Sequence, residues 1–93
     1  MKNKFEMGSI FATPGAIELM ELCNVNPSRL LDRHKGGDWG DVCDADKQAN
    51  EDALLNGDRL VSSYAMPEHK HEKILTITEA DRSATTLLLL SEY

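Results

Sequence analysis

GGDWGDVCDADKQAN, residues 36–50, joins two segments of helical pattern and holds the only tryptophan of the chain, Trp39. Glycines close to Trp39 on both sides permit positive φ angles and a close approach of neighbouring backbone. An indole ring carries a large apolar surface, so we expect Trp39 to be buried. The sequence therefore predicts that Trp39 is a wedge between a helical half and a sheet, and that this loop organises the fold.

The size and composition indicate a single small domain that covers residues 1–93. The chain is 41% hydrophobic and 28% charged, which is ordinary for a globular protein. Its 16 acidic residues outnumber the 10 basic residues and give a formal net charge of -6. This balance argues against direct nucleic-acid binding, which depends on basic residues that displace counterions from phosphates. It suits a basic partner or a surface that imitates DNA.

Targeting and metal motifs are also missing from the sequence. The N-terminal segment lacks the apolar run and cleavage site of a secretion signal, and the leucine run at residues 87–90 is far too short to span a bilayer. Cys23 and Cys43 form no CxxC pair, so we expect two reduced thiols. His69 and His71 have no paired cysteines to complete a zinc site. We therefore expect a cytoplasmic protein without a membrane segment, a metal or a cofactor.

Three helices are predicted before residue 57. The first two begin where a capping side chain precedes a proline, at Thr13-Pro14 and Asn26-Pro27. Gly36 ends the second helix after a basic last turn. The third helix is expected to start with Asp44 as its N-cap and to stop near residue 55, before Gly57. Its inner face is predicted to be small, formed by Ala45, Ala49, Ala53 and Leu54.

Strands are predicted over residues 5–12, 59–66, 73–79 and 84–90, with a polar turn over residues 67–72. Short loops join the last three strands, which is typical of an antiparallel meander. Alternation places Leu75 and Ile77 on one face of the sheet and Thr76 and Thr78 on the other. The predicted fold class is α+β, with N-terminal helices packed on a three- to four-stranded antiparallel sheet.

Four aspartates of the central loop are candidates for chemistry: Asp38, Asp41, Asp44 and Asp46. Closely spaced carboxylates can bind Mg²⁺ or Ca²⁺, but their spacing does not fit an EF-hand loop. The alternative is that these side chains bond turn amides and favour the start of a helix. A second acidic group, Glu79 and Asp81, stands beside Arg82 in a predicted turn.

Motifs for nucleophilic catalysis or phosphate binding are weak. Cys43 stands among acids that disfavour its thiolate, and Ser62 and Ser63 lack the turn that exposes a nucleophilic serine. We therefore predict that the protein is not an enzyme. The remaining features suit recognition, with a candidate interaction surface made of Asp38, Trp39, Asp41, Asp44, Asp46, Glu79, Asp81 and Arg82.

Three segments carry a resemblance to a known family: GGDWGDVCDADKQAN (36–50), GDRLVSSY (57–64) and ITEADRSATTLLLLSEY (77–93). With ATPGA (12–16), they resemble uncharacterised short bacterial proteins of plasmids and other mobile DNA, often called plasmid-related proteins. Some members carry a label of type I restriction modification subunit. The resemblance covers nearly the whole chain and implies a setting in mobile DNA, but no activity. Leu90 stands where family members commonly have a proline.

These observations predict a non-enzymatic accessory protein of mobile DNA that binds an unidentified protein partner. One alternative is a small metal-dependent hydrolase that uses Asp38, Asp41 and Asp44. The other is an acidic DNA-mimic inhibitor of restriction or defence, with charges supplied by the third helix. Pairing of exposed sheet edges also makes a homodimer an expectation.

Overall fold

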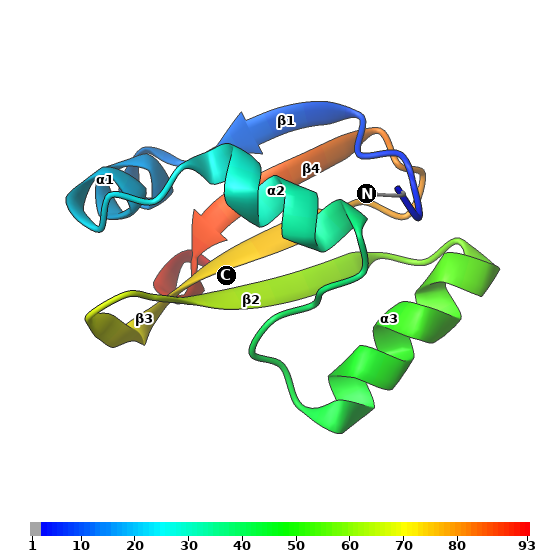
Figure 1. Cartoon of the computed structure of the whole chain (residues 1–93). Helices are drawn as coiled ribbons and strands as arrows, with labels where there is room; N and C mark the ends of the chain where they lie inside the picture. The colour runs from blue at the N-terminus through cyan, green and yellow to red at the C-terminus, as the bar shows by residue number, and fades with distance from the viewer. Residues whose placement is uncertain (1–2) are drawn as a thin grey trace.

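A computed structural model describes residues 3–93, without the side chains of residues 70 and 71. The elements follow the chain in the order β1 (Ser9–Ala12), α1 (Pro14–Leu22), α2 (Pro27–Lys35), α3 (Asp44–Asn56), β2 (Leu60–Met66), β3 (His69–Thr78), β4 (Ala84–Leu89) and the short 3-10 helix η1 (Leu90–Glu92). The four strands form one sheet in the order β1-β4-β3-β2 (Figure 1). The predicted α+β class is confirmed. No helix within residues 3–93 is long and apolar enough to cross a membrane.

The first two helices begin where local sequence predicts, and the second also ends there. The Thr13 side chain accepts a hydrogen bond from the amide of Ala16, and the Asn26 side chain accepts one from the amide of Ser28. Each cap satisfies an amide that the first helical turn leaves without a partner. Gly36 is the C-cap of α2, as expected.

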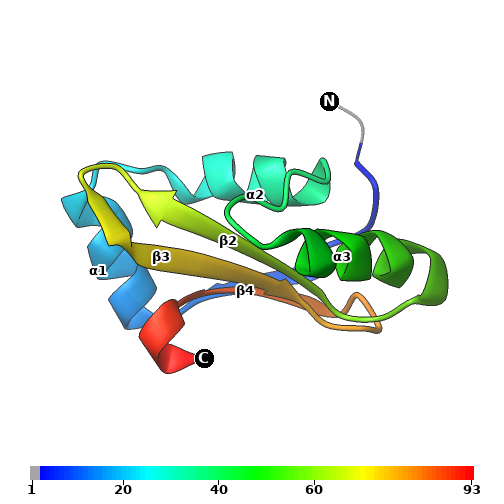
Figure 2. The ribbon, with the colours of Figure 1, turned by 90° about the horizontal axis from the view of Figure 1, so that it is seen from below.

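Two predictions for α3 are wrong. Its N-cap is Cys43, whose side chain makes no capping bond, and Asp44 is the first helical residue. The buried residues of α3 are Asn50 and Ala53, whereas Ala45 and Ala49 are exposed. The reason is that α3 contacts the sheet mainly along β2, at its edge, rather than lying across a sheet face (Figure 2). Only a narrow strip of the helix is therefore covered.

The sheet is mixed, so the prediction of a wholly antiparallel sheet is wrong. Strands β2, β3 and β4 form the expected antiparallel meander, but β1 pairs with β4 in parallel. The Ser9 amide donates to the carbonyl of Ser83 at 3.0 Å, and Gly8 has a φ of 65° at this contact. This contact places the start of β1 beside the start of β4, so both strands run in the same direction.

Several predicted boundaries also move. Residues 5–8 stay outside the sheet because Phe5 packs against Trp39 instead. Strand β3 begins at His69, inside the predicted turn, because Glu68 adopts a φ of 63° and closes a tight turn after Pro67. The last strand ends at Leu89, and η1 follows it, so the helices are not confined to the N-terminal part.

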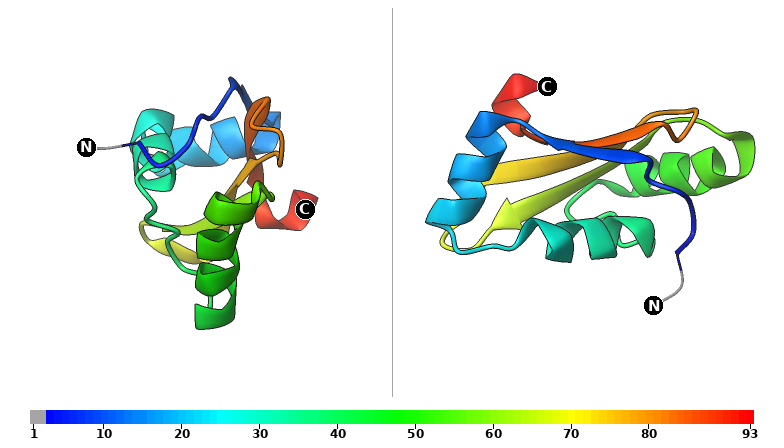
Figure 3. Two further views of the ribbon diagram at one scale, coloured as in Figure 1. Left: turned by 90° about the vertical axis from the view of Figure 1, so that its right-hand side faces the viewer. Right: turned by 90° about the horizontal axis from the view of Figure 1, so that it is seen from above.

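The two faces of the sheet are covered differently. Helices α1 and α2 lie over one face, where a core of Ala16, Met20 and Leu30 meets Tyr64 and Leu87. Short η1 lies on the opposite side of the sheet from α2 (Figure 3). We call that second side the helix-free face, because no α-helix within residues 3–93 lies across it. The strand residues on this face include Phe11, Val61, Leu75, Ile77, Thr86 and Leu88, as the strand register shows.

Candidate functional site

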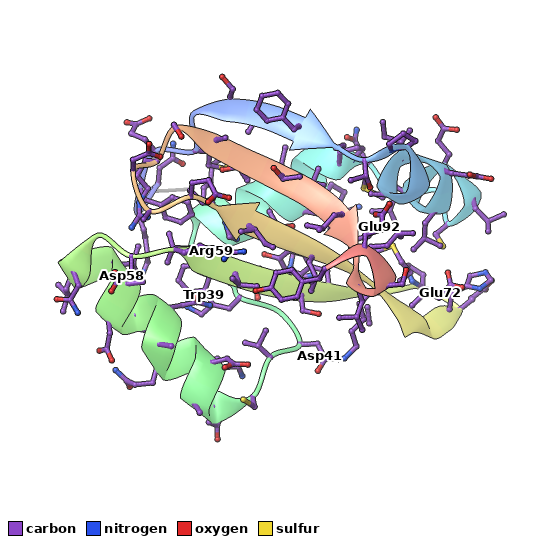
Figure 4. The ribbon with its side chains drawn as sticks, turned by 180° about the vertical axis from the view of Figure 1, so that it is seen from behind. Trp39, Asp41, Asp58, Arg59, Glu72 and Glu92 are labelled. Carbon is purple, nitrogen blue, oxygen red and sulfur yellow. The ribbon has the colours of Figure 1, made fainter. Side chains whose placement is uncertain are left out.

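Trp39 is buried, as predicted, with only 4% of its surface exposed. It packs with Ala53 of α3 and Leu60 of β2, and its ring stacks on Phe5 with centroids 6.3 Å apart. Its Nε1–H donates to a carboxylate oxygen of Glu51 at 2.9 Å, so the polar edge of the indole is satisfied. Figure 4 shows Trp39 between β2 and α3. The predicted wedge between helices and sheet is confirmed.

The aspartates of the central loop point to separate partners. Asp38 accepts hydrogen bonds from Arg33 Nε at 2.7 Å and from the Gly40 amide at 3.1 Å. Arg33 thereby lowers the pKa of the Asp38 carboxyl. Asp41 pairs with Lys73 at 2.9 Å, and the Lys73 ammonium lowers the pKa of Asp41.

The other two loop aspartates, Asp44 and Asp46, lie in the first turn of α3, where the helix dipole favours negative charge. Within residues 3–93, no group of three or more His, Cys, Asp or Glu side chains is placed to hold a metal ion. The side chain of His71 lies outside the described residues. Cys23 is half-buried, Cys43 is exposed, and both are free thiols.

The second acidic group belongs to the turn between β3 and β4. Asp81 accepts a hydrogen bond from the Ser83 amide at 3.0 Å, and contacts with Ser83 lower the pKa of Asp81. Arg82 donates to the main-chain carbonyls of Asp58, Glu79, Ala80 and Ala53, rather than to the neighbouring carboxylates. Arg82 therefore ties this turn to the end of α3. Its guanidinium lies 5.8 Å from the Phe5 ring, at the margin of the Trp39 cluster.

A buried polar network under α2 was not predicted from the sequence. His34 is fully buried, with Nδ1 2.5 Å from Ser62 Oγ and Nε2 2.9 Å from Thr78 Oγ1. Thr78 Oγ1 lies 2.7 Å from Thr85 Oγ1, which donates to the carbonyl of Met7. The spacing of His34 four residues after Leu30, on the buried face of α2, is the one sequence signal for it.

This network fixes the proton positions. Because Thr85 donates to a carbonyl, it accepts from Thr78, and Thr78 in turn accepts from His34 Nε2–H. Ser62 then donates to Nδ1. Burial, and secondarily the charge of Arg82, lowers the pKa of His34 to about 4, so the ring is neutral. The whole network is buried below α2 and, through Ser62, Thr78 and Thr85, joins β2, β3 and β4 to that helix.

The outer edge of β2 is closed by hydrogen bonds from the chain itself. The Asn50 side chain accepts from the amide of Val61 at 3.1 Å and donates to its carbonyl at 2.8 Å. Ser63 donates to the carbonyl of Trp39, and its carbonyl accepts from the amide of Asp41 at 2.6 Å. We call this the closed edge. These bonds occupy the outward backbone groups of Val61 and Ser63, so another strand cannot pair with this part of the edge.

The outer edge of β1 is different. The Ser9 amide donates to the carbonyl of Ser83, just before β4, and the Thr13 amide donates to the carbonyl of Leu87 in β4. The alternation of a parallel pair therefore turns the backbone groups of Ile10 and Ala12 outward. Among the described residues, none bonds to these outward groups. Ile10 is 45% exposed and Phe11 is 55% exposed. We call this the open edge; Figure 1 shows β1 at the margin of the sheet.

No family model, curated protein or solved structure matches this chain.

Proposed function

We propose that this chain is a non-enzymatic interaction protein that binds a partner protein at the open edge and the adjoining part of the helix-free face. The observation that carries the proposal is the contrast between the two edges of one sheet. Asn50 and the Trp39 loop bond the outward backbone groups of Val61 and Ser63 in β2. In β1 the outward groups of Ile10 and Ala12 have no partner among the described residues, and the side chains of Ile10 and Phe11 are exposed. A free edge strand with apolar neighbours suits the addition of a partner strand.

The chemistry of the open edge describes the partner. Outward amides and carbonyls of Ile10 and Ala12 would supply main-chain hydrogen bonds, while the Phe11 ring would supply apolar contact on the helix-free face. The partner is therefore a protein that presents an extended segment with an apolar side chain facing Phe11. The setting as an accessory protein of mobile DNA rests on the sequence resemblance.

Site-specific photocrosslinking in the native host tests this proposal. A photoreactive phenylalanine analogue replaces Phe11 in one variant and Leu55 in the control; Leu55 is 86% exposed on α3, next to the closed edge. We expect one adduct of defined mass from position 11 and none from position 55. Ile10→Lys, which places a charge on the edge strand, should abolish the adduct while thermal unfolding remains cooperative.

The mass of the adduct identifies the partner. An adduct of twice the chain mass means a second copy paired through β1, and any other single mass means a different protein. Equal labelling from positions 11 and 55, or an adduct that survives Ile10→Lys, would contradict the proposal.

A further inference from the structure

A cavity of about 290 Å³ opens between α2 and the C-terminal end of β2. Val25, Ala65 and Pro67 supply its accessible apolar surface, since the other apolar lining residues, Leu30 and Met66, are almost fully buried. Arg29 and Arg33 also line it. The two arginines are four residues apart on α2, so they project from the same side of the helix. The lining contains no carboxylate, although the chain as a whole has a net charge of -6.

The two guanidinium groups differ in the number of hydrogen-bond partners that they have. Arg33 uses Nε and Nη2 to hold Asp38 and lies over the Tyr64 ring, with its Cζ 4.4 Å from the ring centroid. These contacts fix its plane and leave Nη1 without a partner among the described residues. The Arg29 guanidinium forms no hydrogen bond or ion pair with any described residue; only the backbone amide of Arg29 is bonded, to the carbonyl of Asn26. The cavity therefore has one fixed and one uncommitted guanidinium.

We propose that this cavity binds a small organic carboxylate with an apolar body. A planar guanidinium matches a carboxylate in a bidentate arrangement, so Arg29 would hold the anion, with Nη1 of Arg33 as a second donor. The apolar body would then leave water against Val25, Ala65 and Pro67, the apolar lining residues that keep accessible surface. Inorganic phosphate has no apolar part and would gain nothing from that surface. The volume lies near the small end of known ligand pockets, so the ligand is small.

NMR titration of the backbone amides with phenylacetate tests the proposal. We expect saturable shifts that centre on residues 24–33 and 65–67, and no saturable shifts with phenylacetamide, which keeps the shape and lacks the charge. Arg29→Gln should weaken phenylacetate binding about tenfold, because it removes a charge-assisted hydrogen-bonding group. The fold should persist in this variant because Arg29 holds no other residue in place.

Arg59→Gln is the matched control, since it removes the same charge from the opposite end of β2, where Arg59 contacts Tyr93. Its affinity for phenylacetate should stay within about twofold of the unchanged protein. Three results would overturn the proposal: equal binding of phenylacetamide, equal loss of affinity in both variants, or tighter binding of inorganic phosphate than of phenylacetate. Absence of any saturable shift would overturn it as well.

Discussion

At the scale of single residues, the most informative group is the buried His34. Its ring bonds through both nitrogens to hydroxyls of β2 and β3, and Thr85 extends the chain of bonds into β4. A charged imidazolium would carry a proton on Nδ1, where Ser62 Oγ now donates, and would place a positive charge below α2 near Arg82. The network therefore favours the neutral ring.

This burial predicts a loss of stability in mild acid. The pKa of His34 is about 4 in the folded state and about 6.5 when unfolded, so the unfolded state binds more protons between these values. The free energy of unfolding should fall by about 3 kcal/mol as the pH drops from 7 to 4, with most of the change above pH 5. Urea unfolding at a series of pH values measures it.

The carboxylates do not obscure this window. Asp38, Asp41 and Asp81 have lowered pKa values, so the stability that they contribute is lost only as the pH falls below about 4. His34→Gln keeps a donor and an acceptor but cannot titrate, and should flatten the profile between pH 7 and pH 5. An unchanged slope in this variant would show that another group causes the loss.

At the scale of elements, the closed edge depends on a glycine. The Trp39 loop reaches Ser63 because Gly40 has a φ of 75°, and a Cβ at this position would collide with the Ser63 carbonyl. Gly57 has nearly the same φ, 74°, but a Cβ there would meet open space. Replacing Gly57 therefore tests only the free-energy cost of a left-handed backbone. Replacing Gly40 adds the cost of losing the contact between the Trp39 loop and β2.

We predict that Gly57→Ala lowers the free energy of unfolding by about 1 kcal/mol, the cost of a left-handed conformation for a residue with a side chain. Gly40→Ala should cost at least about 2 kcal/mol more, because the loop must also withdraw from β2. Chemical denaturation of both variants measures the difference. Equal losses would mean that contact between the loop and β2 contributes little.

Asn50 gives a second test of the closed edge. Asn50→Ala removes both hydrogen bonds to Val61 and should destabilise the protein by about 2 kcal/mol, because the side chain is buried and the strand groups lose their partner. It should also raise the concentration-dependent self-association measured by light scattering, since a second edge becomes available. Asn56→Ala, at the exposed end of α3, is the control and should leave self-association unchanged.

At the scale of the whole molecule, the sequence predicted local features such as helix ends better than it predicted contacts between distant segments. The caps at Thr13 and Asn26 and the stops at Gly36 and Gly57 depend on residues within one helical turn. They were readable from the sequence.

The direction of β1 could not be predicted from the sequence. It depends on the close backbone contact of Gly8 and Ser9 with Ser83, which lies far along the chain. The closing of the β2 edge by Asn50 and the buried network of His34 were missed for the same reason. Asn50 looks like an ordinary polar residue of a helix until the strand order shows that β2 is an edge. The hydroxyls around His34 come together only through the register of three strands. The predicted aspartates, by contrast, are engaged in ion pairs and helix ends.

Amide hydrogen exchange, followed by NMR at low protein concentration, tests the central claim that one edge of the sheet is closed and the other is open. The amides of Val61 and Ser63 should exchange slowly because the chain itself supplies their acceptors, whereas those of Ile10 and Ala12 should exchange far faster. Slow exchange at Ile10 and Ala12 in the monomer, to the level of Val61, would contradict the account.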